Sequence, residues 1–177
     1  IIASNSFGLL AMLESFGASP EIFPIIPDDV KSIQETLKLA QSFDLIITIG
    51  GASVGKYDFV KTAAFENKQG LNFEKIAMKP GKPVFSGKIN GVPIVGLPGN
   101  PVSSLISCFI LVKPMIKKML GFTKFIEPKI TAKLKNSLSK NTIREHFMRS
   151  KLTIENKEYY VECLENQDSS LLNELTK

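Results

Sequence analysis

The sequence predicts an α/β protein: a three-layer α/β/α domain with a mainly parallel sheet over residues 1–122, followed by a small β-barrel-like domain over residues 123–177. Three observations lead to this prediction. Strand and helix patterns alternate through the first part, which is typical of α/β domains. The run DLIITI (44–49) is apolar and rich in β-branched residues, as in a central strand covered on both faces. From Phe122 onward, apolar and polar residues alternate with period two, which indicates strands.

The elements of the first half follow from capping residues and periodicity. Ser4 or Asn5 caps a helix that ends at Gly17, and acidic residues open the helices that follow the next two strands. The expected elements are strands at 1–3, 21–26 and 44–49, and helices from Ser4 or Asn5, from Asp28–Asp29 and from Asp58 to Gly70.

The second half of this domain has different signals. Asn90-Gly91 lies between two apolar runs and predicts a β-hairpin. Asn100-Pro101 starts a long apolar helix, because proline is favoured at the first helical position. We expect Pro114 to kink this helix and Gly121 to end it.

The remaining residues predict three strand patterns and a short final helix. The strand patterns are KITAKLKNSL, FMRSKLTI and YYVECL, with a turn at ENKE (155–158). Three strands are too few to close a barrel. We therefore expect this domain to be incomplete and the chain to be a fragment of a longer protein.

The charge distribution predicts an anionic ligand. The chain carries a formal net charge of +5, and residues 75–126 contain eight lysines and no acidic residue. A stretch of one sign attracts anions. Aromatic residues are not interleaved with these lysines in the way that base-stacking platforms would require, and no nucleic-acid motif is present, so nucleic acid is the weaker interpretation. No stretch is long and apolar enough for a membrane span.

Four clusters are candidates for chemistry. The first is IGGASVGKYD (49–58), where a central strand runs into Gly50, Gly51, Ser53 and Gly55. Backbone amides in such a loop, with the helix that follows, can receive a phosphate. A tight turn that simply requires glycine is the alternative.

The second cluster is the pair Asp28 and Asp58. Each precedes a helix that follows a strand, so both are expected at one edge of the sheet, where two carboxylates can hold Mg²⁺ together with substrate phosphates. The alternative is that each is only a helix cap.

The third and fourth clusters are proline-rich loops. In KIAMKPGKP (75–83), Lys75, Lys79 and Lys82 lie in or beside a loop that prolines stiffen, and a stiff loop can bind an anion at low entropic cost. The alternative is that this loop is only a solvated basic segment. In LPGNPVSS (97–104), prolines fix the backbone around a helix start suited to an oxyanion. The residues proposed to contact the ligand there are Pro98, Gly99, Asn100, Pro101 and Ser103.

Two cysteines and one histidine argue against a zinc site. Cys108 and Cys163 are far apart in apolar contexts and are expected to be reduced, as in a cytoplasmic protein. His146 is assigned no catalytic role.

The motifs TIGGASVGKYDFV, AMKPGKPVF and GLPGNPVSS, in this order and spacing, resemble the MoeA/gephyrin E-domain family of molybdopterin molybdenumtransferases. The resemblance covers nearly all of residues 1–121 and extends more loosely to the C-terminal β segment. It implies a molybdopterin-binding domain of the MoaB/Mog-like fold. It also implies a transferase of molybdenum cofactor biosynthesis that inserts molybdate into adenylylated molybdopterin and releases AMP with the help of Mg²⁺.

By position, the resemblance makes Asp28, Asp58, Lys75 and Lys79 catalytic residues, with Asp28 and Asp58 as metal ligands. It places Gly50, Gly51 and Ser53 in the substrate loop, and Pro98 and Pro101 beside the molybdate. It further implies a cytoplasmic homodimer and, as a partner, the molybdopterin adenylyltransferase. The family's N-terminal domains have no counterpart in this sequence, so a fragment of this kind would bind without turning over. A non-catalytic pterin-binding or scaffold module of the same fold is the alternative function.

Overall fold

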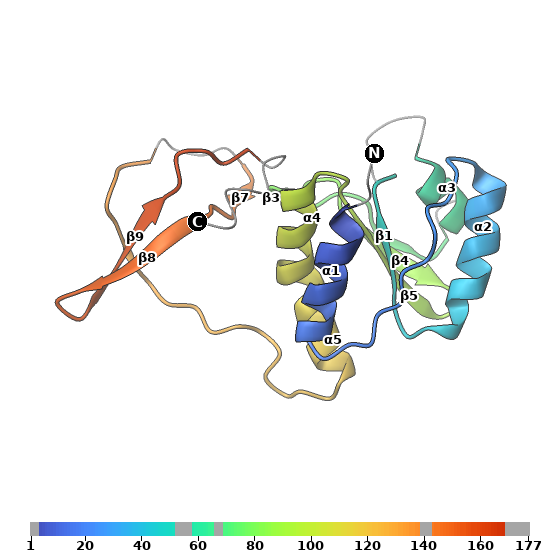
Figure 1. The fold of residues 1–177 in the computed structure, drawn as a ribbon, viewed down its shortest axis with the longest axis horizontal. Helices are drawn as coiled ribbons and strands as arrows, with labels where there is room; N and C mark the ends of the chain where they lie inside the picture. Colours follow the sequence, from blue (N-terminus) through green and yellow to red (C-terminus); the bar gives the residue numbers. More distant parts are fainter. Residues whose placement is uncertain (1–3, 52–57, 66–68, 139–142, 169–177) are drawn as a thin grey trace.

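The computed structural model describes residues 4–51, 58–65, 69–138 and 143–168. These ranges form an α/β domain and a C-terminal β extension that reaches away from it (Figure 1). The main sheet orders its strands β1-β5-β4-β2. The strand bounds are β1 (Ile46–Ile49), β2 (Leu71–Phe73), β4 (Phe85–Ile89) and β5 (Val92–Leu97). No described helix is of the length and apolarity that crossing a membrane requires.

Helices cover both faces of this sheet, which confirms the expected three-layer α/β/α order (Figure 1). One face carries α1 (Ser4–Ser15), α4 (Pro101–Ser107), the π-helical segment η3 (Cys108–Val112) and α5 (Lys113–Met119). The other carries α2 (Val30–Leu39), the 3-10 turn η1 (Ala40–Ser42) and α3 (Phe59–Ala64). The π-helical segment ends two residues before Pro114, which has no N–H to continue the helical pattern.

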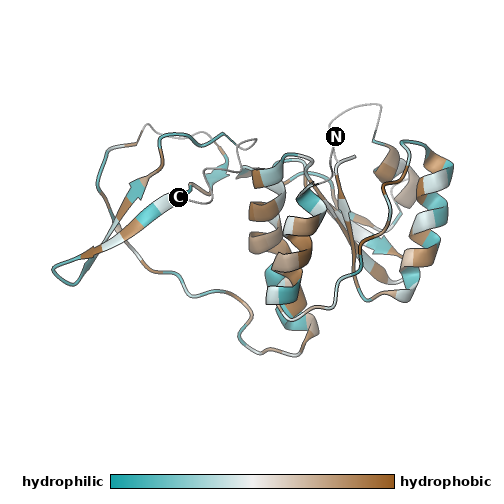
Figure 2. Cartoon of the chain, viewed as in Figure 1, coloured by the Kyte–Doolittle hydropathy of each residue, from teal (hydrophilic) through white to brown (hydrophobic). Residues whose placement is uncertain are grey.

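Strand β5 alternates its side chains between the two cores. Val95 and Leu97 pack against α1 and α4, whereas Ile94 packs with the residues of α2. All three are essentially excluded from water, and burying a side chain of this size contributes about 1.5–3 kcal/mol. Figure 2 shows hydrophobic residues mainly along the middle of the continuous helix formed by α4, η3 and α5, as expected of a helix packed between α1 and the sheet.

Two expectations about the sheet need correction. Among the described strands of the main sheet only β1 and β5 are parallel, whereas β4 is antiparallel to both β5 and β2, so this sheet is mixed rather than mainly parallel. The hairpin at Asn90-Gly91 causes this, because it reverses the chain with positive φ at both residues. Residues 21–26 form no strand, and Pro24 in their middle cannot donate to a ladder.

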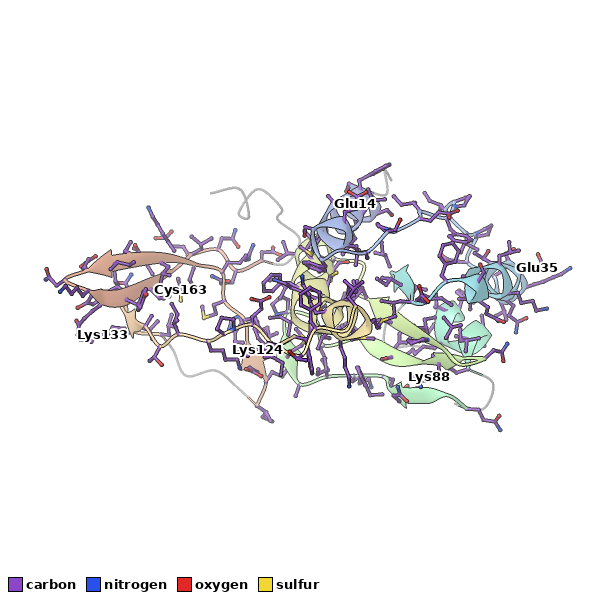
Figure 3. The ribbon with its side chains drawn as sticks, turned by 90° about the horizontal axis from the view of Figure 1, so that it is seen from below. Glu14, Glu35, Lys88, Lys124, Lys133 and Cys163 are labelled. Carbon is purple, nitrogen blue, oxygen red and sulfur yellow. The ribbon has the colours of Figure 1, made fainter. Side chains whose placement is uncertain are left out.

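The C-terminal extension contains an open three-stranded sheet in the described residues. Its order is β6-β9-β8, and its strands are β6 (Lys133–Leu134), β8 (Ser150–Glu155) and β9 (Glu158–Cys163). Lys133 and Cys163 mark this sheet in Figure 3, well away from Glu35 on α2. Exposed apolar residues such as Leu152 and Ile154 lie on it, and no closed barrel is formed in this part of the structure.

A short parallel pairing joins the extension to the α/β domain. Strand β3 (Met78–Lys79) pairs with β7 (Glu145–His146), so Lys79 lies opposite His146. Backbone hydrogen bonds run from Glu145 N to Ala77 O (2.9 Å) and from Phe147 N to Lys79 O (2.8 Å). Burial lowers the pKa of His146, and the positive charges of Lys79 and Arg144 lower it further.

Gly96→Ala is expected to destabilise the α/β domain by about 1–3 kcal/mol or more through overpacking. A Cβ at this position would lie 1.9 Å from Cε1 of Phe85, whose buried ring covers Gly96. Urea unfolding followed by circular dichroism measures the loss. Gly8→Ala is the control, since its Cβ would meet Leu105 Cδ2 at an ordinary 3.6 Å. Equal stability of the two variants would contradict the packing argument.

The lowered pKa of His146 predicts a pH dependence of stability. The folded state disfavours the imidazolium, so the unfolded chain binds more protons as the pH falls below the ordinary value of 6.5. The contribution of His146 to the free energy of unfolding is thus fully present at pH values above 6.5, the ordinary pKa of histidine. It is lost as the pH falls through the lower pKa that His146 has in the folded state. Urea unfolding between about pH 7.5 and pH 5 should show a steeper loss for the wild type than for His146→Gln. Parallel profiles would exclude this role.

Candidate functional site

An open cavity of about 380 Å³ lies where the parallel strands β1 and β5 end. Gly50 N donates a hydrogen bond to Leu97 O (3.0 Å), which continues the pairing of the two strands one residue further. The lining residues come from the two loops that follow these strands, from the lysine-rich loop and from α4: Gly50, Gly51, Pro83, Pro98, Gly99, Asn100 and Ser103. None of these side chains is charged, so the cavity wall offers backbone amides and a hydroxyl.

The loop after β1 requires glycine for steric reasons. Gly51 has φ +65°, and a Cβ there would lie 2.5 Å from Val60 Cγ2 in α3. Gly50 has φ +79°, in the left-handed region that favours glycine. Ser53 and Gly55, also predicted to contact substrate, lie outside the described residues.

The loop after β5 is fixed from both sides. Asn5 of α1 donates its side-chain amide to Gly99 O (2.7 Å), and Ser104 N donates to Asn100 O (2.9 Å) in the first turn of α4. Pro101 occupies the start of α4, as predicted. Ser103 is 5% exposed and lines the cavity, so its hydroxyl and the free backbone amides of the first turn are available to an oxyanion.

The lysine-rich loop packs directly onto α4. A Cβ on Gly81 would lie 2.4 Å from Ser107 Oγ, so only glycine allows this approach. Ile76 N donates to Lys82 O (3.0 Å), which closes the loop, and Pro83 reaches the cavity wall. The lysines of this loop, Lys75, Lys79 and Lys82, are exposed and pair with no carboxylate of the described residues.

Asp58 is buried at the start of α3, with 7% of its surface exposed. Its Oδ1 accepts a hydrogen bond from Lys61 N (3.0 Å), which makes it the helix cap that the sequence predicted. Its Oδ2 lies 2.7 Å from Lys61 Nζ, although this approach does not have hydrogen-bond geometry. Lys61 was not singled out from the sequence, although its i+3 spacing from Asp58 places the two on one helix face.

Asp28 is exposed and does not cap α2. That role belongs to Asp29, whose Oδ1 accepts from Ser32 N (2.8 Å) and whose pKa is lowered by this hydrogen bond. The helices α2, α3 and α4 all begin at the same end of the sheet, the end at which β1 leads into Gly50 (Figure 1). Within the described ranges, no three His, Cys, Asp or Glu side chains are grouped closely enough to form a metal site by themselves.

A larger hollow of about 550 Å³ between α1 and α5 contains none of the predicted residues. Its charged side chains are already engaged: Lys113 Nζ lies 2.6 Å from Glu127 Oε1, and Lys117 Nζ lies 4.5 Å from the ring centre of Phe122. The candidate site is therefore the cavity at the sheet edge, because six of the predicted ligand-binding residues line it: Gly50, Gly51, Pro98, Gly99, Asn100 and Ser103. The other described candidates are not among its lining residues: Asp28, Asp58, Lys75, Lys79, Lys82 and Pro101.

Comparison with known proteins agrees with the resemblance read from the motifs. Residues 1–118 match the family described as "Probable molybdopterin binding domain", and residues 131–177 match "MoeA C-terminal region (domain IV)". The chain is 40% identical over 129 residues to a molybdopterin molybdenumtransferase of Haemophilus influenzae. This alignment covers 72% of this chain and 32% of the relative. The chain thus spans about a third of that relative's length.

Solved structures support the fold. The molybdopterin biosynthesis MoeA protein of Pyrococcus horikoshii OT3 superposes with a TM-score of 0.77 at 27% identity, covering 99% of this chain and 40% of that one. A molybdenum cofactor biosynthesis protein B superposes with a TM-score of 0.53 at 18% identity, over 67% of this chain and 86% of that one, which shows the fold alone. The molybdopterin-binding domain family matches residues 1–118, well over half of the 177 residues of this chain. The chain therefore belongs to that family, and a MoeA-type C-terminal region follows the domain.

Proposed function

We propose that this chain is part of a molybdopterin molybdenumtransferase of molybdenum cofactor biosynthesis, which binds adenylylated molybdopterin and molybdate and releases AMP. The observation that carries the proposal is the cavity at the sheet edge, with an uncharged wall of glycines, prolines, Asn100 and Ser103. The lysines on the adjoining loop are exposed and pair with no carboxylate of the described residues. Both substrates are anions with several oxygens, and such groups need many donors more than a single counter-charge.

Each group of residues at the site has a separate proposed role in binding. The amide of Gly50 already donates to Leu97 O, so the fixed donors are the amide of Gly51 and those of the first turn of α4, which cost little reorganisation when an oxyanion binds. Lys75, Lys79 and Lys82 supply the positive charge that draws the substrate toward the cavity. Asn5 holds the carbonyl of Gly99, so that the loop keeps one shape. Molybdate is expected beside Pro98, Pro101 and Ser103.

Asp58, with Asp28, is proposed to hold Mg²⁺. Asp58 fits a cation, because its buried Oδ2 accepts no hydrogen bond from the described residues. Two carboxylates are enough, since Mg²⁺ keeps several waters and uses substrate phosphates as further ligands. Bound Mg²⁺ would offset the charge that develops on the phosphate as AMP leaves. A cytoplasmic homodimer that receives its substrate from the molybdopterin adenylyltransferase completes the proposal.

Lys79→Ala is expected to weaken the binding of AMP together with molybdate by about three- to tenfold at low salt, and less at high salt, because added ions screen exposed charges. Isothermal titration at two salt concentrations measures this change. Lys88→Ala is the matched control: it removes a lysine of the same acid-free stretch, which lies on β4 next to the hairpin turn (Figure 3). An equal effect of both variants would show that only net charge matters, and not the loop.

Asp58→Asn is expected to slow the single-turnover release of AMP by about a hundredfold or more, because the change removes the charge that holds the cation. Asparagine caps a helix about as well as aspartate, so α3 should remain intact. Asp29→Asn, at the cap of α2, is the control and should leave the rate unchanged. The rates are measured in the protein that carries this segment. An unchanged rate in Asp58→Asn would remove Asp58 from the reaction.

A further inference from the structure

Lys61 occupies the place where a cation at Asp58 would bind. Its ammonium lies 2.7 Å from Asp58 Oδ2, and its side chain is 17% exposed. The helix cap uses the other oxygen, since Oδ1 accepts from Lys61 N. The two functions of Asp58 are thus separated, and Oδ2 can change its partner without loss of the cap.

Lys61 also has a second carboxylate within reach. Glu74, which follows β2, has its Oε2 3.8 Å from Lys61 Nζ, and its side chain is 40% exposed. The ammonium therefore lies between two carboxylates at unequal distances. Its contact with Asp58 Oδ2 lacks hydrogen-bond geometry, so a shift toward Glu74 breaks an ion pair but no directional bond.

We propose that Lys61 is the resident counter-ion of Asp58, that it competes with the divalent cation for Oδ2, and that Glu74 accepts its ammonium when the cation binds. This inference rests on the proposed role of Asp58 in holding Mg²⁺. Among the described residues Lys61 is the cation paired with Asp58, and a buried carboxylate that loses its compensating charge is strongly unfavourable. With Lys61 in place, a bound cation would face a positive charge a few ångströms away, unless that charge moves.

The competition gives Lys61 a positioning function. It keeps Asp58 ionised and oriented before the cation arrives, and it makes cation binding weaker than the two aspartates alone would allow. A purely structural ion pair at the start of α3 would also stabilise the helix, but it would not involve Glu74 in cation affinity. The participation of Glu74 is therefore the distinguishing observation.

The test is the affinity of the chain for Mn²⁺ alone, measured from the electron paramagnetic resonance signal of free Mn²⁺. Lys61→Gln keeps an amide that can donate to Asp58 and removes the charge, so it should tighten binding by about tenfold or more. Lys61→Arg should restore the wild-type affinity. Glu74→Gln should weaken binding by about two- to fivefold, because the displaced ammonium loses its second partner. The double variant Lys61→Gln/Glu74→Gln should bind as Lys61→Gln does.

Controls separate this inference from the proposal on which it rests. Lys38→Gln removes an exposed lysine at the end of α2 and should leave the affinity unchanged, and circular dichroism checks the folding of every variant. Binding that depends on Asp58 but is not altered by Lys61→Gln would overturn the inference alone. Equal affinity of wild type and Asp58→Asn, with no tightening in Lys61→Gln, would overturn the metal role of Asp58 and the inference with it. Binding seen only in Lys61→Gln, and lost when Asp58→Asn is added, would support the inference.

Discussion

The parallel pairing of β1 with β5 is the constraint on which the site depends. Two parallel neighbours end at the same edge of a sheet, so the loops that follow them must meet there. The hydrogen bond from Gly50 N to Leu97 O continues this pairing beyond the strands, and a Cβ added to Gly99 would lie 3.7 Å from Gly50 Cα. The cavity wall is therefore built by segments that are distant in sequence, and its shape follows from strand register and not from any single motif.

Local features were predictable from the sequence because their causes are local. The turn at Asn90-Gly91 needs two residues that tolerate positive φ, and Asp58 caps α3 because its carboxylate can reach an amide three residues on. Features that depend on a distant partner were not predictable. Residues 21–26 have the composition of a strand but no ladder, and nothing in residues 75–83 indicates that β7 pairs with Met78 and Lys79. Pro83 belongs to a motif that was noticed for its lysines, yet it is Pro83 that lines the cavity.

In the candidate site, the positively charged side chains are separate from the residues that line the cavity. The cavity wall is uncharged, whereas the lysines stand on the adjoining loop, where water stabilises them while the site is empty. Uncharged donors held by the backbone cost little to desolvate, and they act on an anion at close range. The exposed lysines would, in the proposed function, act over a longer distance and raise the rate at which an anion encounters the site. This arrangement explains why a strongly basic stretch contains a neutral pocket.

The attachment of the C-terminal extension bears on the lysine loop itself. β7 pairs with the two residues that end at Lys79, so the backbone of this lysine is held on one side by β7 and on the other, through Gly81, by α4. A lysine whose backbone is fixed loses less entropy when it binds an anion than one on a free loop. The extension contributes this effect although its three-stranded sheet lies far from the cavity. The regions that match the two families therefore meet at this point, because β7 of the second pairs with the loop of the first for which anion binding is proposed.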